Sequence, residues 1–308
     1  MKRRDFVKTG ALISSLSFFN NLLYSKNINS NSSKLNYNLN YAPHFGMFKH
    51  HAGDDLIDQI QFMYDHGFKA IEDNGMKSRS KSMQEKISKK LQTLDMSMGV
   101  FIGSSIDWEK PTLTTGIKEF QDKFLNDLKE SIEVAKRVNA TWMTIVPGVI
   151  DLKQEIDYQT VNLIEILKKG CELLEPHGLI MVLEPLNWWT NHPGQFLKKI
   201  PQAYKICKSV NSPSCKILFD IYHQQISEGN IIPNFEKSWR EIAYIQIGDN
   251  PGRNEPTTGE INYKNIFKYL HNKEYKGILG MEHGNSIKGK KGEKKIIEAY
   301  REVDNFQI

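Results

Sequence analysis

Residues 161–187 contain one full unit of the pattern that decides the fold: Val161-Asn-Leu-Ile-Glu-Ile-Leu-Lys-Lys-Gly-Cys-Glu-Leu-Leu-Glu-Pro-His-Gly-Leu-Ile-Met-Val-Leu-Glu-Pro-Leu-Asn187. Apolar side chains recur every three or four residues from Val161 to Leu174, which predicts an amphipathic helix. Gly178 then ends the helix, because glycine readily adopts the left-handed backbone that helix ends use. The apolar run Ile180–Glu184 follows as a short strand. A helix therefore leads into a strand that ends in a carboxylate.

The same alternation extends along residues 36–308, where helices are predicted at 55–66, 120–138, 161–174 and 296–303. Strands are predicted at Asn38–Ala42, Ala70–Asp73, Ser97–Ile102, Trp142–Val146, Ile180–Glu184, Lys216–Asp220, Ala243–Ile247 and Gly277–Met281. Strands that alternate with helices form a parallel sheet. Eight such units match a closed (β/α)8 barrel, an α/β fold with a single domain. An open doubly wound sheet is the alternative, but the stretch Tyr41–Gly46 lacks the glycine-rich phosphate loop that usually follows its first strand.

Polar side chains follow four consecutive predicted strands at the point where each strand ends. Glu184, Asp220, Gln246 and Glu282 occupy these positions. In a barrel of this kind the strand ends and the loops after them carry the chemistry. A carboxylate at the end of a buried strand is costly to desolvate unless it is paired or bound to a cation. Oxygen ligands suit Mg²⁺ or Mn²⁺, so these four residues predict a site for one divalent metal ion.

Two further residues lie near the same predicted rim. His223 follows Asp220 by three residues and is either a packed histidine or a ligand of the substrate. Arg253 is the single cation in the proline- and glycine-rich loop 249–263, where a guanidinium suits a substrate carboxylate or polarised oxygens. The alternative is that Arg253 pairs with Glu255 or Glu260.

Other charged stretches are weaker candidates. Glu72 and Asp73 end the second predicted strand, and one of them could simply cap the next turn. The lysine-rich run Lys288–Lys295 is typical of a solvated loop and helix start, and an anion-binding role is the less favoured alternative.

The composition excludes several classes of protein. The net charge of +5 includes +4 from the first thirty residues, so the remainder is nearly neutral and lacks the basic excess of a nucleic-acid binder. No run reaches the ~18 apolar residues that span a bilayer. The cysteines Cys171, Cys207 and Cys215 are too few for a disulfide framework or a zinc ribbon.

The N-terminus resembles a targeting signal. Arg3-Arg4-Asp-Phe6-Val-Lys8 is followed by a short apolar stretch, an arrangement similar to the twin-arginine export signal. The Asn/Ser-rich residues 27–33 predict a linker. We therefore assign residues 1–35 to a signal and linker that direct the protein to the periplasm; a cytoplasmic location is expected if the leader does not function.

Three motifs together resemble the hydroxypyruvate isomerase family within the xylose isomerase-like TIM barrels. They are Leu183-Glu-Pro-Leu-Asn187, the loop Asp249-Asn-Pro-Gly-Arg-Asn-Glu-Pro-Thr-Thr-Gly-Glu-Ile-Asn-Tyr263, and Met281-Glu-His-Gly-Asn-Ser286. The resemblance spans about residues 38–303. The endonuclease IV branch of this fold uses additional histidines for three zinc ions. After its second and third strands this chain has Glu72-Asp-Asn74 and Gly103-Ser-Ser105 instead, which disfavours DNA repair.

The resemblance implies roles for the residues already named. Glu184, Asp220, Gln246 and Glu282 would bind one divalent metal, Glu184 and Glu282 would also be the catalytic acid/base pair, and His223 and Arg253 would contact substrate oxygens. The implied reaction converts hydroxypyruvate to 2-hydroxy-3-oxopropanoate by proton transfer through an enediolate. The ketose 3-epimerases usually have histidine where this chain has Gln246, which favours the hydroxypyruvate isomerase branch.

Two alternatives stay open. An exported isomerase or 3-epimerase of keto-sugars would use the same metal and glutamates, and Trp188-Trp189 could stack on a sugar ring. A secreted barrel without catalysis is the second, which the complete ligand set argues against. The expected partner is a small hydroxy-keto acid or keto-sugar, and the sequence also leaves a homo-oligomer open.

Overall fold

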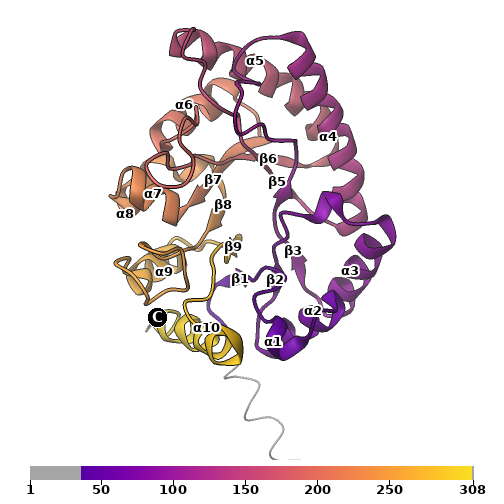
Figure 1. The fold of residues 1–308 in the computed structure, drawn as a ribbon, viewed down its shortest axis with the longest axis vertical. Helices are drawn as coiled ribbons and strands as arrows, with labels where there is room; N and C mark the ends of the chain where they lie inside the picture. The colour runs from indigo at the N-terminus through magenta and orange to yellow at the C-terminus, as the bar shows by residue number, and fades with distance from the viewer. Residues whose placement is uncertain (1–35, 307–308) are drawn as a thin grey trace, which may run out of the picture. The chain divides into compact units, whose positions relative to one another are not determined.

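The computed structural model describes residues 36–306, and they form a ring of short parallel strands surrounded by helices (Figure 1). The strands are β1 Asn40–Ala42, β2 Ala70–Ile71, β3 Ser97–Met98, β4 Phe101–Ile102, β5 Trp142–Ile145, β6 Ile180–Leu183, β7 Cys215–Asp220, β8 Ile242–Gln246 and β9 Ile278–Gly280. Seven of them pair in the order β1-β9-β8-β7-β6-β5-β4, and β2 pairs with β3. A parallel bridge between His44 and Glu72 joins the ends of β1 and β2 and closes the ring. The predicted (β/α)8 barrel is thus confirmed.

The helices follow the strands as the sequence pattern predicts. They are α1 Lys49–Ala52, α2 Leu56–Asp65, α3 Lys81–Thr93, α4 Lys118–Val138, α5 Ile156–Leu174, α6 Ile200–Val210, α7 Ile221–Ser227, α8 Ile231–Ser238, α9 Tyr263–Asn272 and α10 Gly289–Val303, with 3₁₀ turns η2 Met76–Ser78, η3 Glu175–His177 and η4 Trp239–Glu241. Helix α10 begins seven residues before the predicted Ile296, so the lysine-rich run forms its first two turns. Gly178 has the left-handed φ of +65° expected of the residue that ends a helical segment.

One predicted strand is interrupted in the structure. Residues Ser97–Ile102 were expected to be a single strand, but the structure breaks them into β3 and β4 at Gly99 and Val100. The Tyr244 side chain from β8 approaches Gly99 so closely that a Cβ atom there would overlap its hydroxyl group. The break therefore comes from packing across the barrel, which a local pattern does not record.

The core has two layers. A small cluster fills the barrel interior and consists of Ala42, Ala70, Val100, Val182, Leu218, Tyr244 and Ile278. Their strand neighbours, such as Leu183, Phe219 and Ile245, belong to the larger cluster packed against the helices. Successive strand residues thus face the interior and the helices in turn. Polar residues, rather than members of this interior cluster, occupy the carboxyl ends of the strands.

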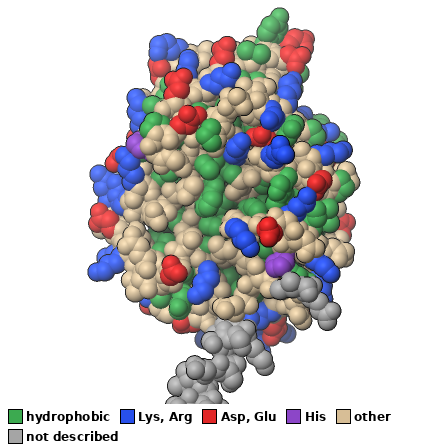
Figure 2. Space-filling model, turned by 180° about the vertical axis from the view of Figure 1, so that it is seen from behind, with side chains coloured by type: hydrophobic (Ala, Val, Ile, Leu, Met, Phe, Trp, Pro, Cys, Tyr) green, Lys and Arg blue, Asp and Glu red, His purple; other side chains and the backbone are tan. Residues whose placement is uncertain are grey.

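The surface mixes residue types. Figure 2 shows acidic and basic side chains interspersed with apolar ones over one face. Within residues 36–306, no helix has both the length and the apolar character needed to cross a membrane. The predicted export signal at residues 1–35 lies outside the described residues.

Candidate active site at the carboxyl ends of the strands

The four predicted metal ligands lie at one end of the barrel. Glu184 directly follows β6, Asp220 and Gln246 are the last residues of β7 and β8, and Glu282 follows β9 by two residues. Asp220 and Gln246 are direct partners in the parallel register of β7 and β8. Both are about 1% exposed, and Glu184 is 7% exposed. The strands therefore deliver Glu184, Asp220 and Gln246 to a buried rim, whereas the side chain of Glu282 is 21% exposed.

Arg253 links two of these carboxylates. Its Nη2 atom donates to Oδ2 of Asp220 over 3.1 Å and to Oε2 of Glu282 over 2.6 Å. Its Nε atom donates to the backbone oxygen of Glu282 over 3.2 Å. The alternative pairing with Glu255 or Glu260 is wrong among the described residues, because Glu255 instead accepts from Ser286 and Glu260 from Asn250.

The loop that carries Arg253 is shaped by a buried carboxylate. Asp249 accepts hydrogen bonds from the backbone nitrogens of Asn250, Thr258, Gly259 and Ile261 at 2.8–3.2 Å. A carboxylate held by several backbone N–H groups can fix an irregular path without regular secondary structure. The loop motif noted in the sequence thus places the guanidinium beside the strand ends.

The site holds more negative charge than its single arginine balances. Burial, together with the neighbouring charges of Glu282 and Asp220, raises the pKa of Glu184 well above its usual value. Burial raises the pKa of Asp220 to about 7, although the charge of Arg253 opposes the shift. Three carboxylates face one guanidinium, so a divalent cation would restore neutrality.

His223 has a defined tautomer. Its Nδ1 atom accepts a hydrogen bond from the backbone nitrogen of Asn187 over 3.3 Å and from the Asn187 side-chain amide over 2.6 Å. A neutral imidazole that accepts at Nδ1 carries its proton on Nε2. That Nε2 atom is buried without a hydrogen-bond partner, 3.8 Å from Glu184 and 3.5 Å from Asp220. His223 therefore presents an unused donor to the site.

Gln246 is oriented by a residue that the sequence analysis ranked as a weak candidate. Its Nε2 atom donates to Oε1 of Glu72 over 2.7 Å, and Tyr244 donates to the other oxygen of Glu72 over 2.7 Å. His44 also lies 2.8 Å from Glu72. With its nitrogen held in this way, Gln246 keeps a buried side-chain oxygen without a partner. Asp73, by contrast, is occupied by Arg79.

These residues fit a divalent metal. Ligand atoms of Glu184, Asp220 and His223 lie within 4.8 Å of one another. The tautomer of His223 directs a proton, not a lone pair, toward this group, so we favour the carboxylates and the free oxygen of Gln246 as ligands. Glu282, the fourth predicted ligand, is not part of this group, and its Oε1 and Oε2 atoms accept from Asn74 and Arg253 over 2.8 and 2.6 Å.

A small cavity of about 150 Å³ opens beside this cluster. Glu184, Glu282, His223 and Arg253, the four residues named from the sequence as candidates for catalysis and substrate binding, all line it. The cavity is also lined by residues without a predicted role: Asn74, Ile102, Ile106, Trp108, Thr144, Val146, Leu186 and His192. Leu186 and His192 follow β6, and the others lie in or after β2, β4 and β5. Asn74, three residues after β2, and Thr144, the next-to-last residue of β5, are polar residues near strand ends that the sequence pattern could have indicated.

The tryptophan pair noted in the sequence lies elsewhere. Trp188 and Trp189 are 37% and 68% exposed, and neither lines the cavity. Lys198 covers the ring of Trp188 at 4.4 Å. Trp108 instead supplies the aromatic wall of the cavity.

Comparisons with known proteins agree with this architecture. The sequence model of the xylose isomerase-like TIM barrel family matches residues 60–303. The hydroxypyruvate isomerase of Escherichia coli is 30% identical over 163 residues, which cover 53% of this chain and 63% of that protein. The 2-oxo-tetronate isomerase of Cupriavidus necator is 28% identical over 160 residues, covering 52% and 61%. The matched stretch thus spans less than two thirds of either relative.

Two solved structures share the fold. An AP endonuclease of family 2 from Brucella melitensis superposes with a TM-score of 0.72 at 23% identity, covering 82% of this chain and 96% of that one. A 3-keto-D-glucoside 4-epimerase from Escherichia coli superposes with a TM-score of 0.72 at 14% identity, covering 87% and 100%. At these identities the likeness establishes the barrel and leaves the reaction to the site residues.

Proposed function

Because this chain belongs to the xylose isomerase-like TIM barrel family, we propose that it is a metal-dependent isomerase of a small 2-hydroxy carbonyl compound. We propose hydroxypyruvate as this substrate, with 2-hydroxy-3-oxopropanoate as the product. The observation that carries the proposal is the excess of buried carboxylates at the strand ends beside an oriented amide oxygen and a small cavity. Relatives that are named as isomerases of hydroxypyruvate and 2-oxo-tetronate support the same reaction class.

Glu184, Asp220, Gln246 and Glu282 would hold one Mg²⁺ or Mn²⁺ ion. Bound there, the cation would act as a Lewis acid on the adjacent carbonyl and hydroxyl oxygens of the substrate. Without it, burial and then the charges of Glu282 and Asp220 raise the pKa of Glu184 and favour its protonated form.

The two glutamates would move the proton. They follow β6 and β9, which β7 and β8 separate in the sheet, and both line the small cavity, so they can approach a bound substrate from different directions. Asn74 and Arg253 each hold one oxygen of Glu282, which fixes the orientation of this carboxylate. Glu184 is more deeply buried and has a raised pKa, and carboxyl groups in unlike environments are suited to accept and return a proton.

His223 and Arg253 would hold the substrate oxygens. The free Nε2–H group of His223 can donate to a carbonyl or hydroxyl oxygen in the cavity. Arg253 already bonds Asp220 and Glu282 through Nη2 and Nε. Its Nη1 atom can therefore offer N–H groups to a substrate oxygen.

The proposal is tested by solvent exchange. Chelator-stripped protein is incubated with Mn²⁺ or Mg²⁺ and hydroxypyruvate in D₂O, and NMR follows deuterium incorporation and the aldehyde product. We expect both signals to require metal. Glu184→Gln and Glu282→Gln should each lose about 10² to 10⁴ of the rate, whereas Glu133→Gln on the exposed face of α4 should behave like the wild type. Normal turnover in both glutamine variants would contradict the assignment.

A keto-sugar isomerase or 3-epimerase is the second candidate. It is favoured by Trp108, which is 48% exposed and lines the site, as suits stacking on a carbon chain or ring. The same exchange assay on a panel of ketoses separates it from hydroxypyruvate isomerisation. A barrel without catalysis would exchange none of these compounds.

We also propose that the twin-arginine-like leader exports the protein. The Arg3-Arg4 pair supports it, and the substitution of both arginines by lysine tests it. Fractionation of cells should find the wild type in the periplasm and the double variant retained inside. An equal distribution of the two would contradict export.

A further inference from the structure

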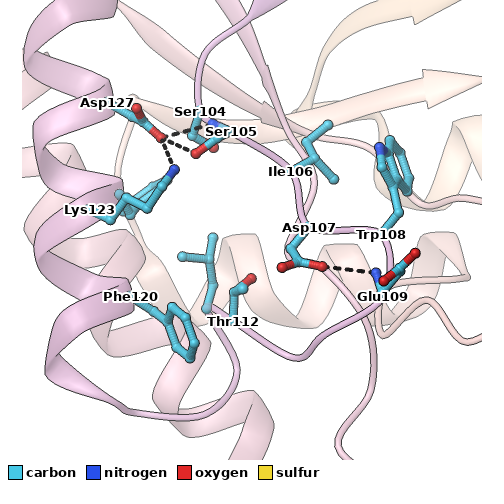
Figure 3. A pocket seen from close by; sticks show the side chains of 12 residues that line it. Ser104, Ser105, Ile106, Asp107, Trp108, Glu109, Thr112, Phe120, Lys123 and Asp127 are labelled. Atoms are coloured by element: carbon cyan, nitrogen blue, oxygen red, sulfur yellow. Dashed lines mark hydrogen bonds and ion pairs between the residues drawn. The ribbon is translucent and has the colours of Figure 1, made fainter.

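A second cavity of about 460 Å³ adjoins the small one. It lies between the segment that follows β4 and the first turns of α4 (Figure 3). Ile106 and Trp108 line both cavities, so the two cavities lie next to each other at these side chains. The ring of Trp108 stacks on His192 at 5.0 Å, and His192 contacts the ring of His223 at 5.3 Å. A molecule long enough to occupy both cavities would therefore pass beside Trp108.

The two cavities differ in the size of the molecule they suit. Cavities that bind small organic molecules commonly measure about 300–1,000 Å³. The small cavity falls below this range and suits only a short reacting unit, whereas the second falls within it. The second cavity has room for a whole ring beyond the reacting carbons.

The walls of the second cavity combine aromatic and acidic groups. Trp108, Phe120 and Phe124 provide apolar ring surface. Figure 3 shows Asp127 and Lys123 across the opening from Trp108, with Asp127 bonded to Ser105. Asp107 and Glu109 lie near Trp108 in the same view. Aromatic faces beside hydrogen-bond acceptors suit a molecule with an apolar face and hydroxyl groups at its edge.

A buried hydroxyl group also lacks a partner here. Ser104 lines the second cavity and is 3% exposed, and its Oγ atom has no hydrogen-bond partner among the described residues. A buried hydroxyl without a partner is costly, so a ligand that supplies one would be stabilised. This observation points to a polar ligand independently of the shape of the cavity.

The charge of the walls selects the class of that ligand. Three carboxylates line the cavity, Asp107, Glu109 and Asp127. Lys123 in the lining and Lys77 outside it both pair with Asp127, so the acidic groups still exceed the lysines by one. An anionic group such as a phosphate or a carboxylate would be repelled, and carboxylates can only accept hydrogen bonds when ionised. Neutral hydroxyl groups, which donate, match them.

We infer that the second cavity binds a neutral sugar ring attached to a reacting keto-sugar, so that the site accepts a glycoside of a ketose in addition to a short 2-hydroxy carbonyl compound. This inference rests on the proposed isomerase function, whose site would act on the keto unit in the small cavity. Trp108 lies where the two parts of such a substrate would meet.

The ring site is tested first by binding, which does not require turnover. Methyl α-D-glucopyranoside is titrated into the full chain and followed by ligand-observed NMR. We expect saturable binding in the millimolar range. Phe120→Ala should weaken it about fivefold through loss of ring contact, and Thr112→Trp should abolish it by filling the cavity. Trp189→Ala, an exposed tryptophan outside both cavities, serves as the matched control and should bind like the wild type.

A turnover assay then separates the test of the ring site from the test of the proposed isomerase function. Solvent exchange is compared for D-fructose and for isomaltulose, which carries a glucose ring on the same ketose. We expect Thr112→Trp to lower kcat/KM for isomaltulose at least tenfold while fructose and hydroxypyruvate change less than twofold. Absence of metal-dependent exchange with every substrate would overturn the proposed function alone, since the glucoside titration still decides the ring site. No glucoside binding by the wild type, or equal binding by Thr112→Trp, would overturn the inference.

Discussion

The side-chain amide of Asn187 donates from Nδ2 to Nδ1 of His223 over 2.6 Å. The orientation of this amide is itself fixed, because its oxygen accepts from the backbone nitrogens of Thr190 and Asn191 at 3.1 and 3.3 Å. The loop after β6 therefore decides which nitrogen of a histidine on α7 carries the proton. A residue that follows one proposed metal ligand by three positions controls the donor that faces the substrate.

Asn187→Asp should reverse that arrangement. A carboxylate accepts at Nδ1, so the proton would move there and Nε2 would lose its hydrogen. We expect turnover to fall at least 10- to 100-fold with a smaller change in KM. Long-range ¹H–¹⁵N spectra of the histidine rings should report the Nε2–H tautomer in the wild type and its loss in the variant. An unchanged ¹⁵N spectrum would refute the control of His223 by Asn187.

Gln246→Leu should weaken metal binding. Leucine removes the unpartnered oxygen that we assign as a ligand and leaves Glu72 without one of its donors. We expect the Kd for Mn²⁺, measured by electron paramagnetic resonance, to rise at least tenfold. Gln61→Leu on α2 is the matched control. Equal affinity in the two variants would remove Gln246 from the ligand set.

Gly280→Ala should destabilise the protein and disturb the same cluster. A Cβ atom at Gly280 would overlap Oε2 of Glu72, which is fully buried and cannot move away. We expect the free energy of unfolding in urea to drop by about 1–3 kcal/mol, with weaker Mn²⁺ binding. Gly75→Ala is the control, because its Cβ would meet the nearest atom at 3.4 Å. Similar losses in both variants would contradict the packing argument.

His283 should make the folded protein less stable as the pH falls. Burial lowers its pKa from 6.5 to about 4, and its Nε2 atom lies 2.8 Å from the hydroxyl of Tyr300. A depressed folded-state pKa means that the stabilisation is complete above pH 6.5 and is lost as the pH falls toward 4. The shift corresponds to at most about 3 kcal/mol.

His283→Phe, which keeps a ring against Tyr300, tests this assignment. Urea unfolding of the metal-free protein should show a smaller loss of stability between pH 6.5 and pH 4 than the wild type shows. Parallel pH profiles for the two proteins would assign the acid sensitivity to other groups.

Much of the barrel follows from short-range patterns. The apolar runs that predict strands from Trp142 onward match β5 to β9 within two residues at each end, because each strand is marked by its own residues and by the turn before it. The positions of Glu184, Asp220, Gln246 and Glu282 at one edge also follow, since parallel strands in a barrel end on the same side. A one-dimensional pattern contains this information.

Tertiary structure decided the rest, because contacts between distant residues leave no local pattern. The packing of Tyr244 against Gly99 broke a predicted strand, and Glu72 lies 174 residues from the Gln246 amide that it orients. The path of its loop decides that Arg253 pairs with Asp220 and Glu282, and not with Glu255 or Glu260. The sequence by itself thus determined the barrel and which residues reach its rim. Only the folded chain determined their protonation and orientation, and the second cavity beside them, since these depend on burial and on neighbours brought together across the barrel.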